Sequence, residues 1–207
     1  MAFRTNKSIF YHIPRTGGMW AKGVARRSGV MYDRAEKNSI RHRLSLMREH
    51  GTPEGVKESA KEGLFSFAFV RMPFEWYKSF WAHRKIHEDS FVAAFPLDFA
   101  WDSNFEKFII NNLRMFPHGF LTDVYQCFVG KDGKDLDFVG KQENLTEDLI
   151  KALTLAGEEF NERTIRRTKR FNVATGRKEV EGLFNISNEL KQELMEKEKW
   201  VTDTFYK

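Results

Sequence analysis

The 207-residue sequence has very little cysteine and no long apolar run. Cys127 is the only cysteine, so no disulfide can form within the chain, and nothing in it requires an oxidising compartment. No run of about 18 apolar residues predicts a membrane-spanning helix. The opening MAFRTNKSIFYHI contains no apolar segment of signal-peptide length. We therefore expect a cytoplasmic protein without a membrane span.

The excess of positive charge is small. Lys and Arg total 34 against 29 Asp and Glu, which is a net charge of +5. This bias favours anionic ligands, including nucleotides, sulfated or phosphorylated sugars and nucleic acid, without choosing among them. Hydrophobic residues make up 41% of the chain and 20 residues are Phe, which is enough for a sizeable core. The length and the lack of internal repeats fit a single domain spanning residues 1–207.

Two segments predict a buried strand followed directly by a helix. The mostly apolar Lys7–Ile13 predicts a strand, and Gly18–Arg27 predicts a helix that Gly29 closes. The aromatic run LFSFAFV, residues 64–70, is typical of a central parallel strand. A proline then opens a helix over Phe74–Lys85.

The rest of the chain predicts several helices and one hairpin. Asp123–Val129 and Leu136–Val139 resemble strands joined through an Asp-Gly turn. Glu158–Lys178 is polar, very basic and the least foldable segment. Helices are predicted at Ser39–His50, Asn104–Leu113, Thr146–Ala156 with Thr146 as its cap, and Glu189–Phe205. The order of strands and helices predicts an α/β fold with three P-loop-like layers, in which helices flank a central, mostly parallel sheet.

Two of these elements offer binding sites for anions. In FYHIPRTGGMWAKG, Phe10–Gly23, a glycine-rich loop joins strand to helix, and the N–H groups of such a loop favour an anion. The second strand ends in Arg71, and Ser79 follows about two turns along the next helix. Parallel strands bring both loops to one sheet edge. Two anion sites there indicate a nucleotide with two separate phosphate groups.

Three segments together resemble the PAPS-dependent sulfotransferases, most closely the branch that contains carbohydrate sulfotransferases. HIPRTGGMW resembles the first phosphate loop of that family, which usually reads Pro-Lys-Thr/Ser-Gly. FAFVRMPFEWYKSFW resembles Phe-Val-Arg-Asp/Asn-Pro with a serine eight residues after the arginine. DFVGKQENLTEDL, Asp137–Leu149, resembles the third stretch, Val-Gly-Arg-Phe-Glu-Asn-Leu. The resemblance extends from about Ile9 to Leu149.

The resemblance implies a role for each matching position. Arg71 and Ser79 would bind the 3′-phosphate of PAPS, and His42 occupies the place of the catalytic base. Trp20 would lie against the adenine, with a place in the core as the alternative. The 5′-phosphosulfate would be held by Arg15, Thr16, Gly17, Gly18 and Met19.

The implied reaction transfers a sulfuryl group from PAPS to an acceptor hydroxyl, with a saccharide as one candidate acceptor. Such a transfer needs in-line placement and neutralisation of the charge on the leaving phosphate. Arg15 supplies that charge, and a histidine at position 42 can accept the proton of the hydroxyl. No metal is expected, since sulfuryl transfer from PAPS needs none.

Departures from the family pattern keep two alternatives open. Arg15 stands in place of the usual lysine, and arginine cannot donate a proton. Met19 replaces a hydroxyl residue, Met72 replaces Asp or Asn, and Gln142 replaces an aromatic residue. A non-catalytic nucleotide- or glycan-binding relative is therefore one alternative. The other is a P-loop nucleotide kinase, which the missing Gly-Lys-Ser/Thr disfavours.

The basic segment between residues 163 and 178 has several interpretations. It is a solvated face, a contact for the nucleotide, or a surface for an anionic acceptor. The resemblance favours cofactor contact around Thr175–Lys178, so Arg177 and Lys178 join the predicted cofactor-binding residues. The segment contains no aromatic-rich motif of the kind that recognises bases, so nucleic acid is not an expected partner.

Overall fold

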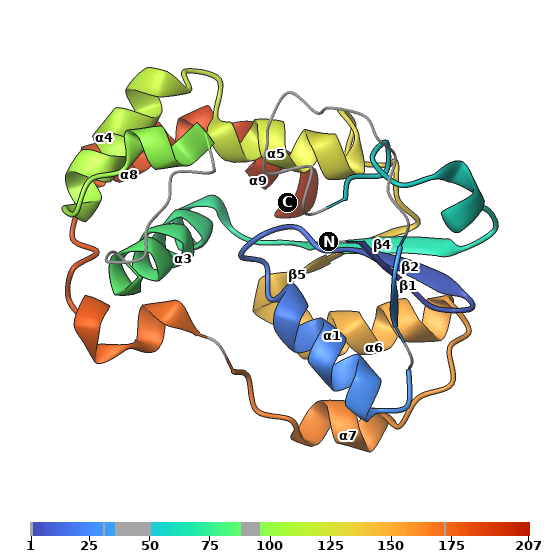
Figure 1. Cartoon of the computed structure of the whole chain (residues 1–207). Helices are drawn as coiled ribbons and strands as arrows, with labels where there is room; N and C mark the ends of the chain where they lie inside the picture. The colour runs from blue at the N-terminus through green and yellow to red at the C-terminus, as the bar shows by residue number, and fades with distance from the viewer. Residues whose placement is uncertain (1, 31, 36–50, 88–95, 172) are drawn as a thin grey trace. The chain divides into compact units, whose positions relative to one another are not determined.

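The computed structural model describes residues 2–30, 32–35, 51–87, 96–171 and 173–207. This part of the chain contains one five-stranded sheet and eight α-helices, which confirms the predicted α/β class (Figure 1). The chain divides into two compact units, of which the first comprises 1–71 and 126–172 and the second comprises 72–125 and 173–207. The single domain and the P-loop-like layering stay predictions. The helix expected at Ser39–His50 lies outside the described residues.

The whole sheet belongs to the first unit. Its strand order is β3-β1-β2-β4-β5. β2 is parallel to β4 and β4 is parallel to β5, whereas β1 is antiparallel to both β2 and β3. Four of the five strands therefore run in one direction, and the sheet is mixed but mostly parallel. The strands are β1 Ala2–Arg4, β2 Ser8–Tyr11, β3 Asp33–Arg34, β4 Phe65–Val70 and β5 Phe138–Lys141.

One face of this sheet is covered by α1 (Gly18–Arg27) and α6 (Leu145–Leu155), and α7 (Glu162–Arg167) packs against these two helices (Figure 1). Side chains alternate between the two faces of a strand, so Phe67 and Phe69 of β4 point into the same core. The other fully enclosed members of that core come from the three helices and neighbouring strands: Phe3, Phe10, Trp20, Ala21, Val24, Ala25, Val30, Leu145, Leu149, Ala152, Leu153 and Ile165.

The second unit is mostly helical. α3 (Pro73–Ile86) packs against α4 (Phe105–Met115), and both contact α8 (Asn188–Lys197). The first half of α5 (Phe120–Val129) belongs here, and α9 (Lys199–Phe205) ends the chain. Aromatic rings fill the core of this unit, and Trp76, Trp81, Tyr77, Phe105, Phe108 and Phe120 are fully buried.

The carboxylate of Glu198 connects three elements of the second unit. Both of its oxygens accept hydrogen bonds at the start of α5, from the N–H groups of Leu121 (2.9 Å) and Thr122 (2.8 Å). The hydroxyls of Tyr77 (2.6 Å) and Thr122 (2.7 Å) donate to it as well. Burial raises the pKa of this carboxyl group, while the hydrogen bonds act to lower it. Glu198 therefore caps α5 from the junction of α8 and α9.

Several predicted elements are confirmed. The helix at Gly18–Arg27 has the predicted bounds, and Gly29 follows it with a φ of 107°. The strand predicted at 64–70 is β4, with parallel neighbours on both sides. Pro73 opens α3 as its first residue.

Three predictions were wrong. The segment 123–129 is the second part of helix α5 and not a strand, so the hairpin around Asp132-Gly133 does not form. Thr146 lies inside α6, whose N-cap is Asn144. The helix predicted at Glu189–Phe205 is interrupted at Glu198 and forms two helices. The short strands β1 and β3 were not predicted.

Candidate functional site

The loop between β2 and α1 is tightly turned. Arg15 has a φ of 64° and Gly17, the N-cap of α1, has a φ of 85°. A positive φ is common for glycine but strained for a residue with a side chain, and such strain concentrates at functional sites. The buried Thr16 hydroxyl donates to the carbonyl of Ile13 at 2.9 Å. The Thr16 side chain therefore stabilises the turn through a hydrogen bond within the loop itself.

The start of α1 offers its backbone to an anion. The N–H of Ala21 donates to the carbonyl of Gly17 at 3.1 Å, so the helical hydrogen bonds begin there and the N–H groups of Gly18, Met19 and Trp20 precede them. The first turn carries no acidic residue. The positive end of the helix dipole is thus not compensated by a side chain of its own helix, which is the arrangement that favours a bound phosphate.

The side chain of His12 packs closely against Gly18, the first residue of α1. A Cβ on Gly18 would lie 2.0 Å from His12 Cδ2 and 2.6 Å from its Nε2, so only glycine fits there. The imidazole is buried, and its ring centroid lies 6.4 Å from that of Phe3 and 6.1 Å from that of Phe10. The sequence did not predict His12 as a binding residue. His12 directly follows β2, and its spacing of two residues from Phe10 was the available signal that it shares the face of Phe10.

Arg71 lies beside the loop. It follows β4, the parallel neighbour of β2, and its Nη1 donates to the carbonyl oxygen of Arg15 at 3.4 Å. Both arginines are half-buried. The sheet therefore brings the Arg71 guanidinium to the backbone of the loop that contains Arg15, as expected for the carboxyl edge of parallel strands.

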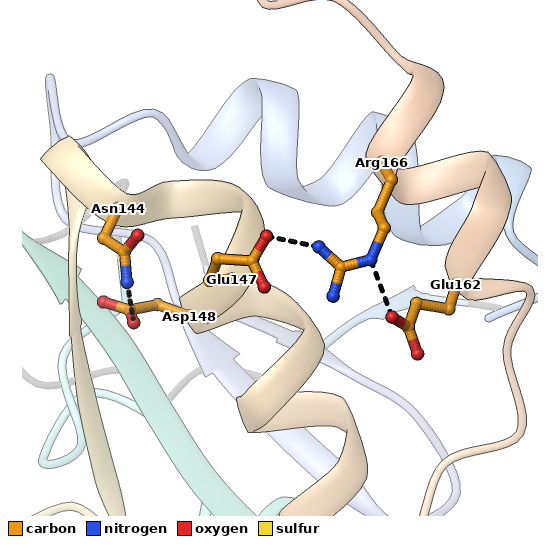
Figure 2. Close-up of polar contacts among 5 residues, drawn as sticks. All are labelled: Asn144, Glu147, Asp148, Glu162 and Arg166. Atoms are coloured by element: carbon orange, nitrogen blue, oxygen red, sulfur yellow. Dashed lines mark hydrogen bonds and ion pairs between the residues drawn. The ribbon is translucent and has the colours of Figure 1, made fainter.

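The third motif also reaches the loop. A Cβ on Gly17 would lie 2.6 Å from Leu145 Cδ2 and 3.5 Å from Gln142 Cγ, so these side chains close over the glycine. Asp148 holds the motif in place by accepting hydrogen bonds from the N–H of Lys141 at 2.6 Å and from Asn144 Nδ2 at 2.9 Å (Figure 2). Glycine is thus required at position 17 both by its φ and by this contact.

Trp20 lies in the hydrophobic core of the first unit. Only 2% of it is exposed, and its Nε1 donates to the carbonyl of Lys169 at 3.1 Å. This geometry agrees with the core alternative, and the adenine contact stays a prediction. Met19, on the same helix, is 48% exposed.

The basic segment after α6 is partly structural. Arg166 pairs with Glu147 of α6 and with Glu162 of its own helix (Figure 2). Arg170 donates to the carbonyl of Glu143 at 3.2 Å, next to the third motif. The hydrogen bonds to Glu147 and Glu162 raise the pKa of Arg166, so its charge is permanent. These contacts fix the segment against α6 and the third motif.

The remaining predicted residues lie in the second unit or outside the described chain. Ser79 is buried in α3. Residues 174–176 and 178–180 form short 3-10 turns that pack against α3, with the exposed Arg177 and Lys178 at their junction. Arg71 and Ser79 belong to different units, so their shared phosphate site stays a prediction. His42 lies outside the described residues.

Comparisons with protein-family models, with curated proteins and with solved structures found no significant match. Across residues 2–30, 32–35, 51–87, 96–171 and 173–207, no group of three or more His, Cys, Asp and Glu side chains is arranged to hold a metal ion. Within the same ranges, no helix is long and apolar enough to cross a bilayer.

Proposed function

We propose that this protein is a sulfotransferase that moves a sulfuryl group from PAPS to an acceptor hydroxyl, with a saccharide as one candidate acceptor. The observation that carries the proposal is the meeting of three motifs at one place. The loop after β2, Arg71 after β4 and Gln142 after β5 follow three adjacent parallel strands. Each motif separately resembles its counterpart in the sulfotransferases, and parallel strands deliver such segments to one edge.

The residues at this edge suit a phosphosulfate group. The N–H groups at the start of α1 have no acidic side chain beside them in the first turn. Arg15 belongs to this loop, and the guanidinium of Arg71 contacts its backbone. Arginine presents a fork of N–H donors that matches phosphate or sulfate oxygens. In this proposal Arg15, Thr16, Gly17, Gly18 and Met19 hold the phosphosulfate.

The catalytic roles follow from the charges of these side chains. PAPS, when bound, supplies the activated sulfuryl group. Arg15 stabilises the negative charge that develops on the leaving phosphate, and it does so at every pH because its guanidinium does not deprotonate. His42 accepts the proton of the acceptor hydroxyl. Arg71 and Ser79 stay predicted ligands of the 3′-phosphate, and Arg177 and Lys178 stay predicted cofactor-binding residues.

Calorimetry with PAP, the desulfated product, tests the nucleotide site directly. We expect PAP to bind the unaltered protein, and Arg15→Ala to weaken binding about tenfold to a hundredfold because charge-assisted hydrogen bonds are lost. Arg15→Lys keeps the charge and restores most of the affinity. Arg26→Ala is the matched control, since Arg26 is an exposed arginine in the last turn of α1. No heat from PAP with the unaltered protein would refute the proposal.

Turnover separates the enzyme from its rivals. Transfer of labelled sulfate from PAPS to a panel of saccharides and other hydroxyl acceptors should survive EDTA, whereas a P-loop kinase needs magnesium. A second candidate is a non-catalytic nucleotide-binding relative. It is favoured by Met19, whose side chain is 48% exposed beside the loop where the family has a hydroxyl. PAP binding without transfer to any acceptor supports this candidate.

A further inference from the structure

The C-terminal end of α3 carries two histidines one helical turn apart. The ring centroids of His83 and His87 are 4.8 Å from each other, and the ring planes are tilted by 58°. Residues four apart lie on one face of a helix, and two histidines at this spacing are a common arrangement of metal ligands in helices. His83 is half-buried and His87 is exposed. Both belong to the second unit.

The separation of the rings fits two imidazoles bound to one ion. With a metal–nitrogen bond of about 2.0–2.1 Å, a ring centroid lies about 3.2 Å from the metal. Two such arms spanning 4.8 Å enclose an angle of roughly 100° at the metal. This angle lies between those of octahedral and tetrahedral coordination, so the separation of the rings is compatible with both imidazoles binding one ion.

Among the described residues, the arginine between the two histidines is paired with a carboxylate. Arg84 lies between the histidines in sequence, and its Nη2 pairs with Asp98 Oδ2 at 2.9 Å. The carboxylate of Asp98 is buried, so the arginine is neutralised by a partner on its own unit. Lys85 is two residues from each histidine and thus on a different side of the helix.

We propose that His83 and His87 form a two-imidazole site for a divalent first-row transition cation, with water in the other coordination positions. Imidazole nitrogen suits Zn²⁺, Ni²⁺ and Cu²⁺, whereas Mg²⁺ and Ca²⁺ prefer oxygen. Cu²⁺ should bind most tightly of the three. The site does not depend on the proposed sulfotransferase activity. Because the ion joins adjacent turns, it stabilises the end of the helix that carries Ser79.

Calorimetric titration of the full chain with NiCl₂ and ZnCl₂ tests the site. Each of His83→Ala and His87→Ala should lower affinity by about tenfold or more, because losing one ligand removes the high effective concentration of the other. His118→Ala is the matched control, since His118 is an exposed histidine of the same unit, and it should leave binding unchanged. Retained affinity in the double variant His83→Ala, His87→Ala would overturn the proposal.

A spectroscopic measurement on the unaltered protein avoids any effect of substitution on folding. With one equivalent of Cu²⁺, electron paramagnetic resonance should show hyperfine coupling to two equivalent imidazole nitrogens. Coupling to a single nitrogen, or a spectrum of free aqueous copper, would overturn the proposal. PAP calorimetry repeated in EDTA reports on the proposed nucleotide site alone, so the two proposals can fail independently.

Discussion

Replacing Gly18 by alanine should destabilise the protein, because the new methyl group would enter the space of His12. Its Cβ would lie 2.0 Å from His12 Cδ2, which is about 1.5–2.0 Å closer than the optimal carbon–carbon contact of about 3.5–4.0 Å. The imidazole is only 7% exposed, and the rings of Phe3 and Phe10 lie next to it. It therefore cannot move away without disturbing the core.

The magnitude follows from two opposing effects. Overpacking of a filled core costs about 1–3 kcal/mol, whereas alanine is better than glycine in a helix by at most about 1 kcal/mol. We expect a net loss of about 1–2 kcal/mol in the free energy of unfolding. In a protein of this size each kcal/mol lowers Tm by about 2–4 °C. Urea denaturation and thermal scans measure both quantities.

A double substitution tests whether His12 is the cause. In a protein that already carries His12→Ala the obstacle is absent, so adding Gly18→Ala should cost about 1 kcal/mol less than it does alone. Gly176→Ala is the control, because a Cβ at Gly176 meets nothing nearer than Val173 Cγ1 at 3.9 Å. The reasoning is refuted if Gly18→Ala carries the same penalty in both backgrounds, or no penalty in either.

Two further predictions concern the second unit and the loop. Glu198→Gln should lose about 1–3 kcal/mol, because the amide nitrogen of glutamine would face N–H donors and leave buried polar groups unpaired. Burial raises the pKa of Glu198 above its usual 4.5, so its contribution is largest below that pH and falls as pH rises through the raised pKa. The difference between the two urea midpoints should therefore change across this window, and a constant difference would contradict the assignment. Arg71→Ala should weaken PAP binding about tenfold to a hundredfold without changing Tm by more than the Arg26→Ala control, as calorimetry and thermal scans will show.

Local signals predicted the first two strand–helix pairs well. Pro73 and Gly29 mark helix ends by their own backbone preferences, and the run of 64–70 is apolar enough to be buried on both faces. The bounds of α1 are therefore those predicted, and each end of α3 lies one residue beyond its predicted position. These preferences depend on a few neighbouring residues, so they can be recognised without knowing how the rest of the chain folds.

The misassigned α5 shows where local signals fail. Its aromatic and β-branched residues are typical of a strand, yet Leu121, Val124, Tyr125 and Phe128 are all buried at helical spacing. The predicted strand began at Asp123 and therefore did not include Leu121, the first of these positions. The cap that begins the helix comes from Glu198, 77 residues away from Leu121, and no local pattern reveals such a partner.

The sequence by itself determined which residues form the motifs: the glycines and Arg15 of the first loop, and Arg71 at the end of an apolar strand. The tertiary structure alone decided that β2, β4 and β5 are neighbours, that Arg71 reaches the carbonyl of Arg15, and that Trp20 lies in the core. The reason is physical. Turn and helix preferences act over a few residues, whereas strand pairing and burial depend on contacts between segments more than 50 residues apart, which form only when the whole chain packs.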